Sequence, residues 1–254
     1  MGNIFFALYC LLYILLMAYT YRLHAAKDLQ HTLLLLLMAG LLYDNFISCT
    51  GFLVGDGALL KGLNIVRYVI HAFATPLLCY IVFIIARKMG VNIFQSSVFE
   101  AAIWILVTGF MLLGYRHELA SMDFVPKIRW GVLNYVHAVS SPPLAAILIN
   151  VFVLVTAIFI WRATRWPVLF ISSLLMFVFA AIPMRNAPPI LGNAGEIIFM
   201  YGFVLAEKRL TDIRHEQVVE KVVFHGLVKN IQMHGRAKAR GMRRTFTVRR
   251  NDEG

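Results

Sequence analysis

The sequence is poor in charged residues, and this deficit is the first guide to its class. Only 15% of its 254 residues are Asp, Glu, Lys or Arg, whereas 60% are hydrophobic. A soluble domain carries roughly a quarter charged residues, so a soluble globular protein is excluded. A mean hydropathy of +0.73 and long apolar runs instead predict an integral membrane protein.

Cysteine is scarce too, and several other sequence patterns are missing. Cys10, Cys49 and Cys79 all lie inside apolar runs. An odd, buried set forms no disulfide framework and has no metal-ligand spacing, so we interpret these residues as packing residues. The sequence has no ten-residue segments in which apolar and polar residues alternate, the pattern that a membrane β-barrel would show. No basic residue precedes the first apolar run, so we read that run as a first span rather than a cleaved signal peptide.

Seven apolar segments are present, each near the ~20 residues needed to cross the hydrocarbon core. They comprise residues 3–22, 31–54, 64–86, 98–115, 143–161, 166–184 and 189–206. Backbone polar groups find no water inside a bilayer, so these segments must be helices. The predicted fold is all-α: a polytopic membrane protein whose seven transmembrane helices lie within residues 1–207.

Basic residues predict the orientation of these spans. With the N-terminus outside, eighteen of the 24 Lys and Arg residues lie on the cytoplasmic side. Positive charge favours that side, so we predict an N-out, C-in protein of the plasma membrane or an organelle membrane, with a cytoplasmic C-terminus. Glu100 lies a few residues from the inner end of its span, where we expect it to pair with Arg87 or Lys88.

Two regions outside the spans have their own patterns. Residues 116–142 interleave aromatic and basic side chains, which predicts a short interfacial helix between the fourth and fifth spans. Residues 208–234 have a near-helical apolar period and predict an amphipathic juxtamembrane helix, or else a continuation of the last span. Residues 235–254 form a basic tail, predicted to be disordered and to bind anionic inner-leaflet lipids. No nucleic-acid recognition fold accompanies this charge.

A layer of polar residues lies inside the predicted spans. Asp44 is about 15 Å from the outer end of its segment at 1.5 Å per residue. His71, Asn150, Asn193 and Glu196 fall on three other segments at depths of about 6–11 Å by the same rise. Ionisable groups are costly in hydrocarbon, so an intramembrane cluster predicts a functional site.

Helical spacing adds a direction to this layer. Arg67 and His71 are four residues apart and share one face, and Asp44 lies on a polar stripe of the preceding segment. We therefore expect the two segments to face each other or a shared cavity. Arg67 and Arg185 lie nearer the outer boundary, where they would attract an anionic headgroup or pair with Asp44 and Glu196.

These patterns leave three functions open. The first is an enzyme doing acid–base chemistry on a lipid-like or isoprenoid substrate, and a layer confined to the outer leaflet favours it because a lipid enters sideways. The second is a proton-coupled transporter of small solutes, and the third a scaffold or regulator acting through its basic tail. In the enzyme, the predicted catalytic residues are Asp44, His71 and Glu196, and the predicted substrate-binding residues are Arg67, Asn150, Asn193 and Arg185.

Two alternatives compete with a catalytic layer. The same residues would also serve as a hydrogen-bond network between helices, worth only about 0.6 kcal/mol per contact. A metal site is not predicted, because Asp44, His71 and Glu196 come from separate segments without an HExxH-type spacing. No cofactor is expected either. The last segment has no lysine for a retinal Schiff base, and residues 192–196 lack the HxxxH of seven-span zinc amide hydrolases.

Overall fold

A computed structural model of the protein describes residues 2–23, 28–120, 123–139, 142–182 and 190–217, together with positions 219 and 224. The chain divides into two units, Met1–Leu210 and Thr211–Gly254. The fold and the candidate site described below belong to the first unit. In the second unit the described residues are helical, and the predicted basic tail, residues 235–254, lies outside the described residues.

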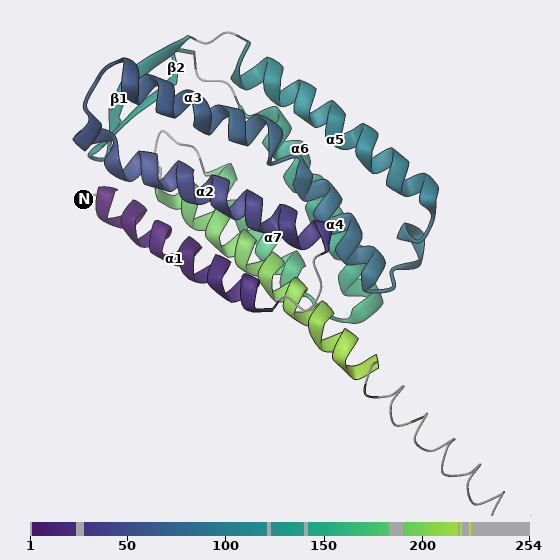
Figure 1. The fold of residues 1–254 in the computed structure, drawn as a ribbon. Helices are drawn as coiled ribbons and strands as arrows, with labels where there is room; N and C mark the ends of the chain where they lie inside the picture. Colours follow the sequence, from purple (N-terminus) through teal and green to yellow (C-terminus); the bar gives the residue numbers. More distant parts are fainter. Residues whose placement is uncertain are drawn as a thin grey trace, which may run out of the picture. The chain divides into compact units, whose positions relative to one another are not determined.

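Helices account for most of the described chain, as the apolar segments predict (Figure 1). Their bounds are α1 Gly2–Arg22, α2 Leu29–Val54, α3 Ala58–Phe73, α4 Leu77–Lys88, α5 Ser97–Glu118, α6 Leu144–Thr164 and α7 Val168–Ala181, followed by a last helix, Ile190–Gln217. Among the described residues, six helical stretches are long and apolar enough to cross a membrane when α3 and α4 count as one. Helix α7 is equally apolar but has 14 residues.

The apolar stretch Ala58–Lys88, which contains the predicted third span, is interrupted between α3 and α4 by a turn at Ala74–Pro76. Pro76 has no backbone N–H, so the carbonyl of Ala72 loses its ordinary donor four residues on. Tighter bonds replace the helical ones: the amide of Leu77 donates to Ala74 at 3.0 Å. Helix α5 approaches the end of α3 closely at Gly114, because a Cβ on this residue would lie only 3.0 Å from the Ala72 carbonyl oxygen.

The prediction of a short interfacial helix between the fourth and fifth spans is wrong, because this region is a β-hairpin. Strands β1 (Phe124–Arg129) and β2 (Val132–His137) pair antiparallel, with Arg129 opposite Val132. The two residues between them, Trp130 and Gly131, have φ of 53° and 77°. Positive φ at both positions is typical of the tight hairpin turn whose twist matches the strands.

The hairpin lies across the ends of α1, α2 and α3. Tyr135 and Leu133 are buried against Ile47 and Leu60, and the amide of Gly2 donates to the carbonyl of Trp130 at 3.2 Å. Gly51 on α2 touches the Leu133 backbone so closely that any Cβ would overlap it. The glycine therefore brings the strand onto the helix end.

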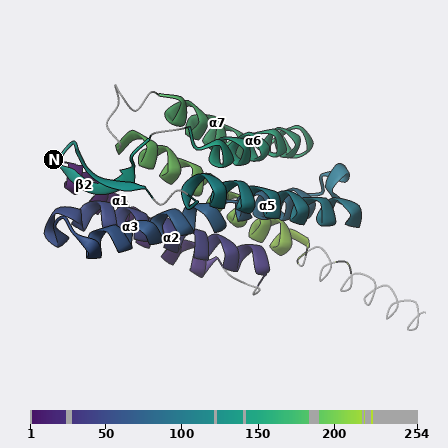
Figure 2. The ribbon, with the colours of Figure 1, turned by 90° about the horizontal axis from the view of Figure 1, so that it is seen from above.

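Figure 2 shows the helices side by side along a common direction, as expected for a bundle of spans. Helix α1 packs on α2, α3 on α5, and α6 on both α4 and α7. The last helix packs on α7 through Gly195 and Gly202, whose missing side chains leave room for Phe179 and Ser172. Small residues at such contacts let membrane helices approach closely.

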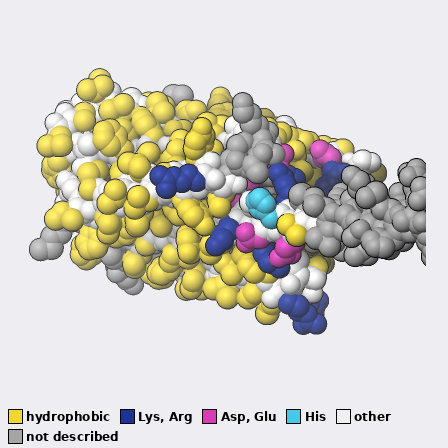
Figure 3. Space-filling model, turned by 60° about the horizontal axis from the view of Figure 1, so that its bottom comes forward, with side chains coloured by type: hydrophobic (Ala, Val, Ile, Leu, Met, Phe, Trp, Pro, Cys, Tyr) yellow, Lys and Arg dark blue, Asp and Glu magenta, His cyan; other side chains and the backbone are white. Residues whose placement is uncertain are grey.

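The outer surface of the helices is apolar. Ile4 on α1 is 74% exposed, and Ile105 on α5 is 75% exposed. Hydrophobic side chains also cover most of the face in Figure 3. A surface of this kind is a liability in water and is expected where lipid chains surround the protein. The structure thus agrees with an integral membrane protein.

Candidate functional site

Three helices bring their polar side chains together around Asp44. The Asp44 cluster consists of Asp44 and Asn45 on α2, Asn64, Arg67 and His71 on α3, and Asn193 and Glu196 on the last helix. Asp44 Oδ1 lies 2.5 Å from Arg67 Nε and 3.5 Å from His71 Nε2. The other oxygen, Oδ2, accepts a hydrogen bond from Asn193 Nδ2 at 3.3 Å. One carboxylate thus has three polar partners.

Local sequence explains why α2 and α3 meet at this point. Arg67 and His71 are four residues apart, so their side chains lie one above the other on the same helix face. Gly40 lies one turn before Asp44 on α2. A Cβ at Gly40 would be 2.6 Å from Cγ2 of Ile70, so the absence of a side chain lets α3 approach. This approach places the Arg67 guanidinium beside the Asp44 carboxylate.

Two asparagines that the sequence did not single out complete the network. Asn64 Oδ1 accepts a hydrogen bond from Arg67 Nη1 at 2.7 Å, and Asn45 Oδ1 accepts one from Asn193 Nδ2 at 3.2 Å. Both amides also donate to carbonyls of their own helices, those of Leu60 and Leu41, at 2.8 Å. Their only sequence signal is their spacing: Asn45 adjoins Asp44, and Asn64 precedes Arg67 by three residues.

Glu196 and Tyr13 differ from the rest of the site. Glu196 Oε2 and the Tyr13 hydroxyl are buried with no hydrogen-bond partner among the described residues. Glu196 interacts electrostatically with His71, Asp44 and Arg67, and Tyr13 with Glu196 and Asp44. An unpartnered buried polar group is costly, and such groups cluster where a protein handles protons or ligands. Tyr13 was not predicted from sequence, because a tyrosine inside an apolar run reads as a packing residue.

Exposure separates the members of the Asp44 cluster. The side chain of Asp44 is 5% exposed and that of Arg67 17%, whereas that of His71 is 34% exposed. His71 directs Nε2 to Asp44, which leaves Nδ1 as the ring nitrogen available to another molecule. A buried carboxylate behind a half-exposed imidazole is an arrangement that orients the ring and stabilises its cation.

Two predicted site residues are not among those that the structure shows around Asp44. Asn150 on α6 is buried, and its Oδ1 has no hydrogen-bond partner among the described residues. Helix α6 packs against α4, α5 and α7, and no described hydrogen bond joins Asn150 to the Asp44 cluster. Arg185, expected at the outer boundary, lies outside the described residues.

A second buried pair lies toward the other end of α2. His31 Nδ1 is 3.5 Å from Glu207 Oε2, and both side chains are less than one-tenth exposed. The pair was not predicted from the sequence, because His31 and Glu207 fall at the boundaries of predicted spans. In the structure the last helix continues past this boundary to Gln217. At the same end Arg87 Nη1 binds Glu100 Oε2 at 2.7 Å, which confirms the ion pair expected for Glu100.

The hairpin end carries further charged contacts. Glu118 lies 3.0 Å from His117 Nδ1 and 3.5 Å from His137 Nε2, and it joins α5 to β2. Tyr135 donates a hydrogen bond to Asp56. Because ionisation of the phenol would lose this bond and set two negative charges together, Asp56 raises the pKa of Tyr135.

Metal-type ligands do not gather at any of these places. Within the ranges that the structure describes, no group of three or more His, Cys, Asp or Glu side chains is arranged to hold a metal ion. The Asp44 cluster is instead a network of ions and amides. Comparison with known protein families finds no family that matches the chain, and no curated protein matches it. We therefore infer its function from the contacts of its own residues.

Proposed function

We propose that this protein is a membrane-embedded enzyme that performs acid–base chemistry on a lipid-like or isoprenoid substrate. One observation carries the proposal: buried Asp44 contacts the half-exposed ring of His71 beside Glu196, whose Oε2 is buried and has no hydrogen-bond partner among the described residues. General acid–base catalysis requires a proton donor and a proton acceptor held together, here at a largely buried site. A hydrogen-bond network that only joins helices would not need this unpartnered carboxyl oxygen.

The residues take distinct roles in this proposal. His71 exchanges a proton with the substrate through Nδ1, and Asp44 holds the ring and offsets its charge. Glu196 provides the second proton-carrying group. Arg67 and Asn193 are positioning residues, because their donors are already directed at Asp44. A headgroup-binding role for Arg67 is less well supported, since its guanidinium is engaged by Asp44 and Asn64.

The proposed topology has seven crossings, with α7 as a short span, the N-terminus outside and the C-terminus cytoplasmic. The distribution of basic residues supports it, and so does the hydropathy of α7. The Asp44 cluster then lies about 15 Å below the hairpin end of α2, at 1.5 Å per residue. Reporter fusions at either end test the orientation, and a cytoplasmic N-terminus would contradict it. The basic tail, residues 235–254, is proposed to bind anionic inner-leaflet lipids.

The enzymatic proposal is tested by comparing lipids in membranes that contain the full-length protein or its variants. We expect the wild type to convert a lipid class detectable by untargeted mass spectrometry. Asp44→Asn and His71→Ala should each lower the conversion by about 10²–10⁴-fold, the usual contribution of acid–base groups. Glu100→Gln is the matched control, because it removes a carboxylate that pairs with Arg87 and does not belong to the Asp44 cluster. Undiminished conversion in both site variants would end the proposal.

A proton-coupled transporter is the second candidate, and the buried His31–Glu207 pair favours it. This pair adds an ionisable site on the inner half, which a relay across the membrane needs. However, His31 and Asp44 are thirteen residues apart on α2, or ~20 Å. Leu34, Met38 and Leu41 are buried between them, so the buried side chains of α2 that separate the two sites are apolar.

Transport and catalysis make different predictions for Glu207. Proton-coupled uptake requires both ionisable sites, so Glu207→Gln should abolish pH-dependent uptake into proteoliposomes. An enzyme confined to the Asp44 cluster should retain its turnover in the same variant. Uptake that is insensitive to pH and to Glu196→Gln would count against the transporter.

A further inference from the structure

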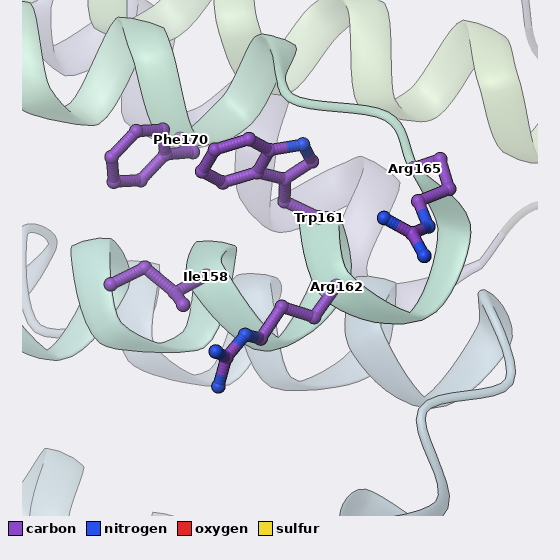
Figure 4. Close-up of a pocket in the computed structure, with 5 residues that line it drawn as sticks. All are labelled: Ile158, Trp161, Arg162, Arg165 and Phe170. Atoms are coloured by element: carbon purple, nitrogen blue, oxygen red, sulfur yellow. The ribbon is translucent and has the colours of Figure 1, made fainter.

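A pocket lies at the turn between α6 and α7, and none of its lining residues belongs to the Asp44 cluster. It has a volume of about 530 Å³ and is lined by Ile158, Trp161, Arg162, Arg165 and Phe170. Figure 4 shows both arginine side chains extending from the end of α6, with the rings of Trp161 and Phe170 side by side. Two cations thus border a pocket whose other lining residues are apolar.

The aromatic part of this pocket is well defined. The Trp161 and Phe170 rings are stacked, with centroids 5.0 Å apart and planes 21° from parallel. Trp161 is 40% exposed, although an indole of this size is normally packed away from water. An exposed tryptophan at the end of an apolar helix is typical of the bilayer interface, where one side of the ring meets acyl chains and the other meets headgroups.

The two arginines are the unusual part. Both are exposed, and neither has a hydrogen bond or ion pair with any described residue. Arg165 ends α6 with φ 60° and ψ 16°, in the left-handed region that helix ends usually give to glycine. An arginine at this position costs conformational energy that a glycine would avoid. Within the described chain, these two guanidinium groups have no carboxylate to neutralise them.

We propose that this pocket binds an anionic phospholipid of the adjacent leaflet. Guanidinium groups match phosphate oxygens with paired N–H donors, so Arg162 and Arg165 hold the headgroup phosphate. Ile158, Trp161 and Phe170 contact the glycerol backbone and the first part of the acyl chains. A free phosphate would use the two arginines but not the apolar lining, which is why the lipid is the better occupant. The site does not depend on the enzymatic role of the Asp44 cluster.

Native mass spectrometry of the full-length protein in detergent tests the proposal. The probes are phosphatidylglycerol and phosphatidylcholine with identical acyl chains. We expect wild type to retain phosphatidylglycerol preferentially, and Arg162→Gln/Arg165→Gln to lower that retention by about thirtyfold, as expected for two lost charges near a headgroup. Lys208→Gln/Arg209→Gln is the matched control, since it removes two exposed charges elsewhere in the same unit and should keep the preference.

Three results would overturn the proposal. They are unchanged retention in the Arg162/Arg165 variant, an equal loss in the Lys208/Arg209 control, and displacement of the lipid by excess inorganic phosphate, which would make a soluble anion the ligand. If the glutamine variant does not fold, Arg162→Lys/Arg165→Lys keeps both charges but loses the planar fork. Its retention should fall below that of wild type, and undiminished retention would refute the assigned contacts.

Discussion

Removing the charge of Asp44 should destabilise the protein mainly because the buried positive charge of Arg67 then lacks its counter-charge. The two side chains are 5% and 17% exposed, and their 2.5 Å contact joins a carboxylate oxygen to Arg67 Nε. Breaking a buried pair by removing one partner costs about 3–5 kcal/mol, because the remaining charge stays buried. Asp44→Asn should therefore lower the melting temperature by about 6–20 °C, at 2–4 °C per kcal/mol for a chain of this size.

A double-mutant cycle isolates this effect. Arg67→Gln alone should be similarly destabilising, whereas Asp44→Asn/Arg67→Gln should recover much of the loss, because no unpaired charge remains. We expect a coupling energy above about 2 kcal/mol, measured by thermal or denaturant unfolding in detergent. Ordinary polar contacts between membrane helices reach at most about 1.7 kcal/mol.

The Arg87–Glu100 pair provides the control cycle. Its side chains are 33% and 39% exposed, so water already solvates both charges and the coupling should be about 0.2–1 kcal/mol. If the Asp44–Arg67 coupling is no larger than this, or the two single effects simply add, the explanation based on an unpaired buried charge is refuted.

Two further predictions concern packing and pH. Gly40→Val should push Ile70 and α3 away and lower the stability by about 1–3 kcal/mol through overpacking. Gly62→Val is the control, because a side chain there meets nothing within 4 Å and should cause no overpacking. Equal melting temperatures of the two variants would contradict this explanation. Since Asp56 raises the pKa of Tyr135, the contribution of this bond to stability is complete below about pH 10 and lost as the pH rises through the folded-state pKa. Tyr135→Phe should therefore melt lower at neutral pH and lack this alkaline loss in melting temperature, and an identical alkaline slope in both proteins would contradict the assignment.

Periodicity in the sequence predicted the helices and part of the site. The i, i+4 spacing of Arg67 and His71 places them on one face, which is enough to direct them at the polar stripe of α2. Depth alone was a weaker guide. Asn150 is at a similar depth, but α6 is not packed on α2, and a distance along the membrane normal says nothing about position around the bundle.

The remaining differences have identifiable causes. Interleaved apolar and basic residues suit an interfacial helix and a half-covered strand equally well, so the hairpin depended on the turn at Trp130–Gly131. Glu207 was placed outside the last span because hydropathy falls there, although the helix itself continues to Gln217. A span boundary marks a change of composition, whereas a helix ends only where its hydrogen bonds end.

The hairpin across α1, α2 and α3 has a consequence for how molecules reach the site. Its strand β2 contacts α2 at Ser48, one turn from Asp44, through a 3.2 Å hydrogen bond from Asn134. Under the proposed topology, the hairpin would lie between the Asp44 cluster and the water, and a substrate dissolved in the bilayer would reach the half-exposed His71 from the side. The reaction would then follow surface-dilution kinetics. Its rate would depend on the mole fraction of substrate in the membrane and would fall when inert lipid is added at constant bulk concentration.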